Sequence, residues 1–182
     1  MALGTWWRGD PLPTLASLPS FTIRTATDAQ LIQHLNKLTT EDFYHRLHTG
    51  NHAYLAYLQE TPVAYGWLGT QEGGVHEIQL AFTLPPDNYY LWDFETLPQW
   101  RGQGIYPHFL QAIIRQEINL AERFWILYEP GNEVAAHSIS KAGFQFVGEL
   151  TLTHGHVSGI ILFNNSSRAY AGASVLGLPI AR

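Results

Sequence analysis

The 182-residue sequence contains no cysteine. Disulfide bonds, thiolate nucleophiles and cysteine-ligated zinc sites are therefore excluded. Positive charge is also scarce, because 10 Lys and Arg stand against 15 Asp and Glu, which gives a net charge of −5 with neutral His. A nucleic-acid-binding surface needs clustered basic side chains. The charge balance thus argues against a nucleic-acid partner.

Long apolar runs are missing as well. A membrane-spanning helix needs about 20 consecutive apolar residues, and no stretch of this sequence approaches that length. The N-terminal stretch has no basic start followed by an apolar core, so it is a poor signal peptide. We therefore expect no membrane partner and a cytoplasmic location.

The composition that is present indicates a folded chain. Apolar residues make up 46% and charged residues 14%, which excludes disorder, and the length suits one domain with its own core. Residues 1–20 carry three prolines and no clear periodicity, so we expect an extended N-terminal arm, anchored by Trp6 and Trp7. We expect the folded domain over residues 21–164 and a C-terminal tail over residues 165–182. A homodimer joined through the arm or the tail is left open.

Hydrophobic periodicity predicts a mixed α/β (α+β) domain, because segments of period two alternate with segments of helical spacing. The expected strands are residues 21–25, 52–58, 63–70, 75–84, 89–97, 124–128, 144–153 and 157–163. The expected helices are a pair within residues 27–48, then residues 105–121 and 133–142, the last ended by Gly143.

One loop carries the strongest chemical signal. This loop, Arg101-Gly102-Gln103-Gly104, follows the expected strand over residues 89–97, which is rich in aromatic residues. It leads directly into the helix that begins at Ile105. A helix start presents unpaired backbone N–H groups, and glycines let a phosphate approach them. The loop therefore predicts a cradle for a phosphate or diphosphate. It is neither a Walker loop, which needs Gly-Lys-Ser/Thr, nor a dinucleotide fingerprint, because Pro107 stands where a third Gly is required.

Other catalytic patterns are weak or missing. The histidines at positions 45, 48 and 52 are close in sequence, but no third ligand with metal-binding spacing follows. We therefore expect a solvated face there and no metal site. The sequence also lacks the Gly-x-Ser-x-Gly turn of serine hydrolases.

Two motifs resemble those of one enzyme family. Thr96-Leu-Pro-Gln-Trp-Arg-Gly-Gln-Gly-Ile105 resembles the acetyl-CoA loop of the GCN5-related N-acetyltransferases (GNAT), whose pattern is Arg/Gln-x-x-Gly-x-Gly/Ala. The sequence departs from it at position 106, which is Tyr. Asn132 to Phe144 resembles the second motif of the family, Asn-x-x-Ala/Ser followed by Lys-x-Gly-Phe. The resemblance covers about residues 21–163 and implies a mostly antiparallel sheet, flanked by helices, with a splayed pair of parallel strands.

The resemblance implies acetyl-CoA as the acetyl donor. Its diphosphate would contact the backbone N–H groups of the loop, and its pantetheine arm would contact the end of the preceding strand and Asn132. The implied donor-binding residues are Phe94, Glu95, Thr96, Arg101, Gly102, Gln103, Gly104, Ile105, Tyr106 and Asn132. The implied reaction is direct attack of a primary amine, of a small molecule or a peptide, on the thioester.

Such a reaction needs a proton acceptor. Asp93 and Glu95 are two residues apart, so a regular strand places both on one face. Their position in an aromatic strand favours either a catalytic role or an ion pair, and the sequence leaves both open; Glu77 is a further candidate base. The position of a thiol-protonating Tyr in some relatives is Ile139 here, with Tyr128 and Ser138 as substitutes. The alternatives are a non-catalytic acetyl-CoA-binding regulatory module and a transferase of a longer acyl group.

Overall fold

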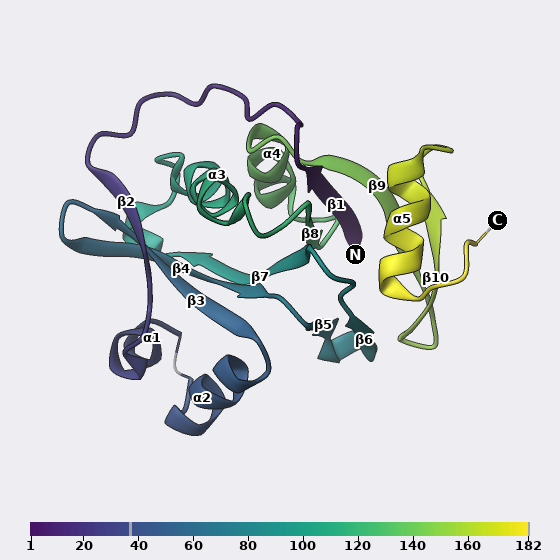
Figure 1. Ribbon diagram of the computed structural model, residues 1–182, viewed down its shortest axis with the longest axis horizontal. Helices are drawn as coiled ribbons and strands as arrows, with labels where there is room; N and C mark the ends of the chain where they lie inside the picture. The colour runs from purple at the N-terminus through teal and green to yellow at the C-terminus, as the bar shows by residue number, and fades with distance from the viewer. Residues whose placement is uncertain (37, 182) are drawn as a thin grey trace.

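The computed structural model describes residues 1–36 and 38–181. Its centre is an eight-stranded sheet with the order β10-β9-β1-β8-β7-β4-β3-β2 (Figure 1). Only β7 and β8 run parallel, and the other paired strands of the described chain are antiparallel. The predicted mixed, mostly antiparallel sheet with one parallel pair is therefore confirmed.

Five helices accompany ten strands in the described chain. The strands are β1 (Ala2–Trp7), β2 (Phe21–Thr25), β3 (Asn51–Leu58), β4 (Thr61–Gly69), β5 (Glu72–Val75), β6 (Leu80–Thr83), β7 (Asn88–Thr96), β8 (Arg123–Tyr128), β9 (Gln145–Thr153) and β10 (His156–Leu162). The helices are α1 (Ala29–Asn36), α2 (Thr40–His48), α3 (Ile105–Glu117), α4 (Glu133–Lys141) and α5 (Ser167–Leu176).

Helices cover both faces of the sheet (Figure 1). On one face, α3 and α4 pack through a cluster that includes Phe109, Ile113 and Ile139, all fully buried. On the other face, α1 and α2 enclose Ile32 and Phe43. The predicted apolar stripe of α3 thus forms the main core, because helical spacing collects its apolar side chains on the side facing the sheet.

The N-terminal residues belong to the centre of the sheet. Strand β1 pairs with β8 on one side and with β9 on the other, with Leu3 opposite both Leu127 and Gly148. Leu3 is fully buried. The expectation of an arm is therefore wrong for residues 2–7, because pairing on both edges and burial on both faces hold this segment within the sheet. Both of its edges are paired within the chain, which also removes them as dimer contacts.

Residues 8–20, here called the strap, cross the outer side of α3 and α4 before β2 begins (Figure 1). The indole N–H of Trp6 donates to the carbonyl of Pro11 at 3.3 Å, and the side chain of Gln111 in α3 donates to the carbonyl of Pro13 at 2.8 Å. The strap is thus fixed to the sheet and to α3, although it has no regular structure.

The C-terminal residues are not a free tail either. Helix α5 packs over β1, β6, β9 and β10 on the face opposite α3 and α4. Arg168 of α5 pairs with Asp10, and its guanidinium lies 4.6 Å from the ring centroid of Trp7. The two ends of the chain thus stabilise each other. A homodimer through the C-terminal residues stays a prediction.

The segment between β4 and β7 differs partly from the expected strand over residues 75–84. It forms a small separate sheet of β5 and β6, interrupted by a 3₁₀ turn at His76–Ile78. Throughout residues 1–36 and 38–181, no helix has the length and apolar character needed to cross a membrane. Within the same ranges, no three His, Asp or Glu side chains gather as metal ligands.

Candidate active site

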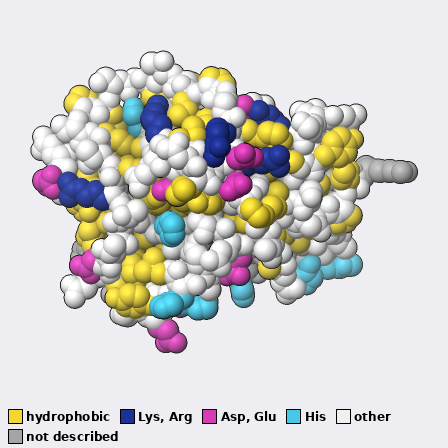
Figure 2. All heavy atoms as spheres, in the orientation of Figure 1, with side chains coloured by type: hydrophobic (Ala, Val, Ile, Leu, Met, Phe, Trp, Pro, Cys, Tyr) yellow, Lys and Arg dark blue, Asp and Glu magenta, His cyan; other side chains and the backbone are white. Residues whose placement is uncertain are grey.

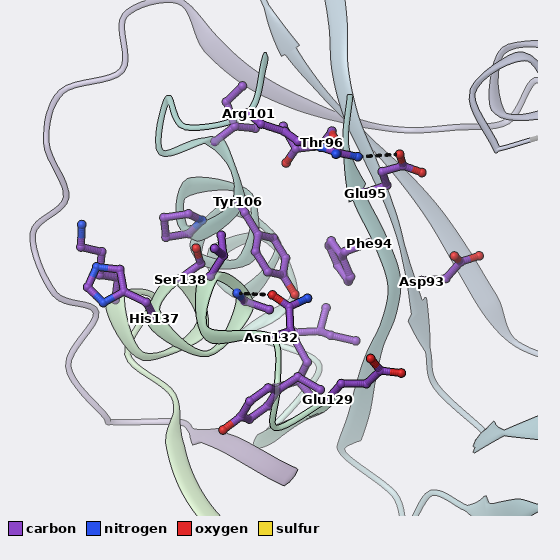
Figure 3. A pocket seen from close by; sticks show the side chains of 18 of the residues that line it. Asp93, Phe94, Glu95, Thr96, Arg101, Tyr106, Glu129, Asn132, His137 and Ser138 are labelled. Atoms are coloured by element: carbon purple, nitrogen blue, oxygen red, sulfur yellow. Dashed lines mark hydrogen bonds and ion pairs between the residues drawn. The ribbon is translucent and has the colours of Figure 1, made fainter. Parts of the chain in front are cut away.

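A cleft opens where β7 and β8 separate. The two strands pair in parallel from Asn88 opposite Arg123 to Leu91 opposite Ile126. Both strands continue further, β7 to Thr96 and β8 to Tyr128, without pairing with each other. The cleft between them has a volume of about 990 Å³, and Figure 3 shows side chains from β7, α3 and α4 projecting toward it. The parallel pair predicted to splay apart is therefore present.

A β-bulge in β7 sets the direction of the side chains along the cleft. Asp93 has a left-handed φ of 51°, and the register with β4 shifts between Tyr65 and Trp67. In a regular strand, Phe94 would point away from α3. With the bulge, its ring packs against Phe109 of α3 with the centroids 5.3 Å apart. An extra residue in one strand locally reverses the alternation of side chains, which explains this reorientation.

Asp93 and Glu95 lie together on the α1/α2 side of β7, where Figure 3 shows both carboxylates. Asp93 pairs with Arg46 of α2. The expectation that the two acids share a face of β7 is confirmed. Leu91 packs with the α3 cluster, and because of the bulge the two acids lie on the face of β7 opposite to Leu91. The sequence left open whether these acids form ion pairs, and the structure shows that each carboxylate has an arginine partner.

Glu95 is held by two donors. The hydroxyl of Tyr65 in β4 donates to one carboxylate oxygen at 2.9 Å, and the guanidinium of Arg101 donates to the other at 3.2 Å. Tyr65 is only 4% exposed, and burial, together with the hydrogen bond to Glu95, raises the pKa of its hydroxyl. Tyr65 thus remains a proton donor toward Glu95 at neutral pH. The arginine also donates to the carbonyl of Thr96, so Glu95 is linked to the start of the glycine loop.

Arg46 is enclosed by aromatic rings next to Asp93. Its guanidinium lies 4.9 Å from the ring centroid of Trp67 and 4.5 Å from that of Trp92. The stacking and the ion pair together hold Arg46 in place. Trp92 lines the cleft, so this side of the cleft combines aromatic surface with carboxylates.

The glycine loop has the geometry that a phosphate group requires. Gly102 and Gly104 have φ values of +78° and +75°, which favour glycine, and a Cβ at either position would meet no atom within 4 Å. Gly104 is the N-cap of α3, and Pro107 lies in the first turn. The space over the loop is open, and the backbone N–H groups of the helix start are not used within α3. These features fit a diphosphate at this point of the cleft.

Two further predicted residues line the same cleft. Tyr106, which departs from the family pattern, has its ring 5.7 Å from that of Phe94, and burial raises its pKa. Asn132 caps α4, with its side-chain oxygen accepting from the N–H of Ala135 at 3.0 Å. Figure 3 shows both side chains between α4 and β7.

The structure brings together all but one of the predicted site residues. Phe94, Glu95, Thr96, Arg101, Gly102, Gly104, Ile105, Tyr106, Asn132 and Asp93 line the cleft. Gln103 lines an adjoining groove instead.

The other residues considered for catalysis lie in different surroundings. Ile139 is fully buried in the core. Tyr128 and Ser138 line the cleft, whereas Glu77 is not among its lining residues. Burial, with smaller contributions from Glu133 and Glu149, raises the pKa of Tyr128.

Sequence reasoning missed three residues of the site: Tyr65, which donates to Glu95, Arg46, which pairs with Asp93, and Glu129, which lines the cleft just after the end of β8. Tyr65 and Arg46 lie in elements far from β7 in the sequence. Only the register of β4 with β7, and the placement of α2 beside them, could have indicated these contacts.

Comparison with protein families identifies the fold around this cleft. The sequence model described as "Acetyltransferase (GNAT) family" matches residues 21–144. No curated protein matches the chain significantly. Known structures nevertheless share its fold at low sequence identity.

A GCN5-related N-acetyltransferase from Kribbella flavida has 17% identity and a TM-score of 0.55, over 80% of this chain and 53% of that one. The chain therefore spans only about half of that protein. AAC(6′)-Iy, in complex with the bisubstrate analogue CoA-S-monomethyl-acetylneamine, has 12% identity and a TM-score of 0.56, over 74% of this chain and 97% of that one. A putative GNAT acetyltransferase from Novosphingobium aromaticivorans has 15% identity and a TM-score of 0.54, over 79% of this chain and 59% of that one.

Proposed function

Because this chain belongs to the acetyltransferase (GNAT) family, whose members use acetyl-CoA as the acetyl donor, we propose that it transfers the acetyl group to a primary amine of a small molecule or peptide. The observation that carries the proposal is the cleft between β7 and β8. The open glycine loop lies at one end of it, and Glu95 lies beside the bulge in β7.

Different groups of the cleft bind different parts of acetyl-CoA. The backbone N–H groups from Gly102 to Tyr106 hold the diphosphate. Beyond Leu91 the edge of β7 that faces β8 is unpaired, so the backbone from Phe94 to Thr96 holds the pantetheine arm as an added strand would. Asn132 provides a side-chain amide from the opposite wall. When bound, acetyl-CoA supplies a thioester carbonyl that is open to nucleophilic attack.

Glu95 accepts the proton that the amine loses. In direct attack the amine nitrogen forms a bond to the carbonyl carbon, the carbon–sulfur bond breaks, and one proton leaves the nitrogen. The carboxylate of Glu95 takes this proton, directly or through one water molecule. Tyr65 holds one oxygen of this carboxylate in place from a buried position. Tyr128 and Ser138, which line the cleft, are the candidate groups for protonating the leaving thiolate.

The acceptor is a cationic amine. Asp93, Glu95 and Glu129 line the cleft together with the ring of Trp92. Asp93 and Glu95 have arginine partners, whereas Glu129 has no ion-pair partner within residues 1–36 and 38–181. The carboxylate of Glu129 attracts an amine that carries a further positive charge, and the ring of Trp92 adds a cation–π contact. AAC(6′)-Iy, which shares the fold, binds a bisubstrate analogue containing acetylneamine.

A cytoplasmic location stays a prediction.

The test is turnover of acetyl-CoA with a panel of amines that includes neamine, polyamines and lysine-containing peptides. Release of free thiol together with an acetylated amine is the expected result. The main alternative is a non-catalytic acetyl-CoA-binding module. It is favoured by the buried Ile139, which stands at the position where some relatives carry a Tyr that protonates the leaving thiolate. Tight acetyl-CoA binding without turnover on any amine would support this alternative. Turnover only with longer acyl-CoA donors would instead support a longer acyl group.

A further inference from the structure

The side chain of Arg101 connects the glycine loop with the proposed proton acceptor. Its Nε donates to the carbonyl of Thr96 at 3.0 Å, and its Nη2 donates to Oε1 of Glu95 at 3.2 Å. Figure 3 shows the guanidinium reaching past Thr96 to the carboxylate. The next residue, Gly102, carries one of the backbone N–H groups proposed to hold the diphosphate. One cation therefore lies between the proposed donor site and the proposed base.

Both oxygens of the Glu95 carboxylate are occupied in the structure. Tyr65 donates to Oε2, and Arg101 donates to Oε1. A general base must come within hydrogen-bond reach of the proton that it accepts. An incoming amine, or the water molecule that replaces it, thus finds no oxygen of Glu95 without a donor already bound to it. Removal of Arg101 would open Oε1 and leave the carboxylate held by Tyr65.

Arg101 also covers a backbone group that the donor is proposed to use. Leu97 donates its N–H to the carbonyl of Val63, so these two residues form a hydrogen-bonded pair that continues the pairing of β7 with β4. Opposite residues of antiparallel strands alternate between hydrogen-bonded and non-hydrogen-bonded pairs. Thr96, opposite Ala64, therefore points its carbonyl away from β4, toward the side of the cleft. The guanidinium thus lies on the edge of β7 where the pantetheine arm is proposed to bind.

The contacts of Arg101 are weak enough to be exchanged. The side chain of Arg101 is 60% exposed and that of Glu95 is 41% exposed, and water screens an ion pair at such a position. A diphosphate at the glycine loop brings more negative charge than one carboxylate. Its oxygens accept from a guanidinium in the same bidentate manner as a carboxylate does. The donor therefore competes with Glu95 for Arg101.

Few other cations are available to the donor. Arg101 and Lys141 are the only Lys and Arg side chains among the described residues that line the cleft. Figure 2 shows few Lys and Arg side chains on the face turned toward the viewer, gathered in its upper half, where Figure 1 places α3 and α4. Lys141 ends α4, whereas Arg101 directly precedes Gly102. Arg101 is thus the cation that the glycine loop itself supplies.

We infer that Arg101 makes the availability of Glu95 depend on the donor. Without acetyl-CoA, Arg101 holds Oε1 of Glu95 and the carbonyl of Thr96. When the diphosphate occupies the glycine loop, the guanidinium turns to it, Oε1 opens to the amine, and Tyr65 keeps Oε2 in place. An amine then meets an open carboxylate only while the thioester is present. The inference rests on the proposed function, and Arg101 is a positioning residue in it because it acts on the amine through Glu95.

The first experiment is a crystal structure of the full chain with CoA. The expected result is a guanidinium of Arg101 within hydrogen-bonding distance of the diphosphate and no longer in contact with Glu95, which stays bonded to Tyr65. A CoA complex in which Arg101 still pairs with Glu95, or contacts neither group, would overturn the inference and leave the proposed function intact. A cleft that holds no CoA would overturn the proposed donor site together with the inference.

Variants of Arg101 test its contact with the donor in solution. Arg101→Gln is expected to bind CoA about tenfold more weakly in calorimetry, because a charge-assisted contact is lost. Arg101→Lys keeps the positive charge and is expected to recover most of the affinity. Arg24→Gln is the matched control, because Arg24 also pairs with an exposed glutamate, Glu60, but lies on the edge strand β2. Unchanged CoA affinity in Arg101→Gln would overturn the inference.

Steady-state kinetics with an accepted amine provides a readout that a structural role would not give. If the guanidinium has left Glu95 in the ternary complex, Arg101→Gln raises the KM for acetyl-CoA and leaves kcat within about twofold of the parent value. A large change in kcat would mean that Arg101 stays beside Glu95 during the reaction, which would overturn the inference. Thermal melts of Arg101→Gln and Arg24→Gln check that both variants fold.

Discussion

The ring of Phe94 lies directly over the α-carbon of Gly66 and leaves no room there for a β-carbon. Gly66 occupies the place in β4 where the register with β7 shifts, opposite the bulge at Asp93. Because Gly66 of β4 has no side chain, the ring of Phe94 in β7 can take its reoriented position. This contact supports the bulge that turns Phe94 toward α3 while Asp93 lies beside Arg46 on the other side of β7.

Gly66→Ala is expected to displace Phe94 and disturb the bulge. Overpacking of this kind costs about 1–3 kcal/mol in the free energy of unfolding, and the cleft would lose affinity for acetyl-CoA because the backbone of β7 moves. Urea denaturation and calorimetry measure the two effects. Gly131→Ala is the control, since a Cβ there meets no atom within 4 Å; equal behaviour of the two variants would contradict the role of Gly66.

Glu95→Gln tests the proposed proton acceptor. The amide keeps the shape of the side chain but cannot take a proton, so turnover is expected to fall about 100-fold to 10,000-fold. The affinity for acetyl-CoA changes little, because the proposed donor contact at this residue is through the backbone. Steady-state rates with any accepted amine, and calorimetry with acetyl-CoA, provide the measurement.

Asp93→Asn is the comparison for Glu95→Gln. Asp93 pairs with Arg46, whose guanidinium stacks on two tryptophans, so its replacement is expected to affect acceptor binding more than the rate at saturation. Should Glu95→Gln turn over like the parent protein while Asp93→Asn loses the rate, the roles assigned to the two acids would be reversed.

Gly104→Val tests the glycine loop. Acetyl-CoA that binds only the native state is expected to add about 2.7 kcal/mol of stability at a hundredfold excess over Kd. The valine side chain would occupy the open space over the loop and remove most of this stabilisation. The left-handed φ of Gly104 adds an intrinsic cost of about 1–2 kcal/mol without ligand. Thermal melts with and without acetyl-CoA separate the two effects.

Gly177→Val is the matched control for the loop variant. Gly177 has a φ of +63° and an equally open surrounding, but it ends α5 and does not line the cleft. It is expected to lose a similar amount of intrinsic stability and to keep the full response to acetyl-CoA. A normal response in Gly104→Val as well would mean that the diphosphate binds away from this loop.

Leu3→Ala tests the position of the N-terminal strand. Leu3 is fully buried between β8, β9 and α5, so truncation is expected to lower the free energy of unfolding by about 2–5 kcal/mol. Leu152→Ala, at a residue that is 50% exposed in β9, is expected to change it by about 0.5 kcal/mol or less. Equal effects in urea denaturation would show that β1 contributes little to the fold.

Local patterns in the sequence determined much of the donor site. The spacing of Gly102 and Gly104 before an amphipathic helix predicted the loop and the start of α3, because φ preference and helical periodicity act over a few neighbouring residues. The resemblance of the same stretch, and of the stretch from Asn132, to one family indicated acetyl-CoA. The alternation of Asp93 and Glu95 was enough to assign them to a shared face.

Tertiary structure alone decided where the N-terminal segment lies and what surrounds Glu95. Residues 2–7 reach the centre of the sheet by pairing with strands more than 100 residues away, and no local pattern specifies the partner of a short strand. The bulge at Asp93 depends on Gly66, and the hydrogen bond to Glu95 comes from Tyr65, both in another strand. Strand register is set by the packing of the whole sheet, so these contacts appear only once the chain has folded.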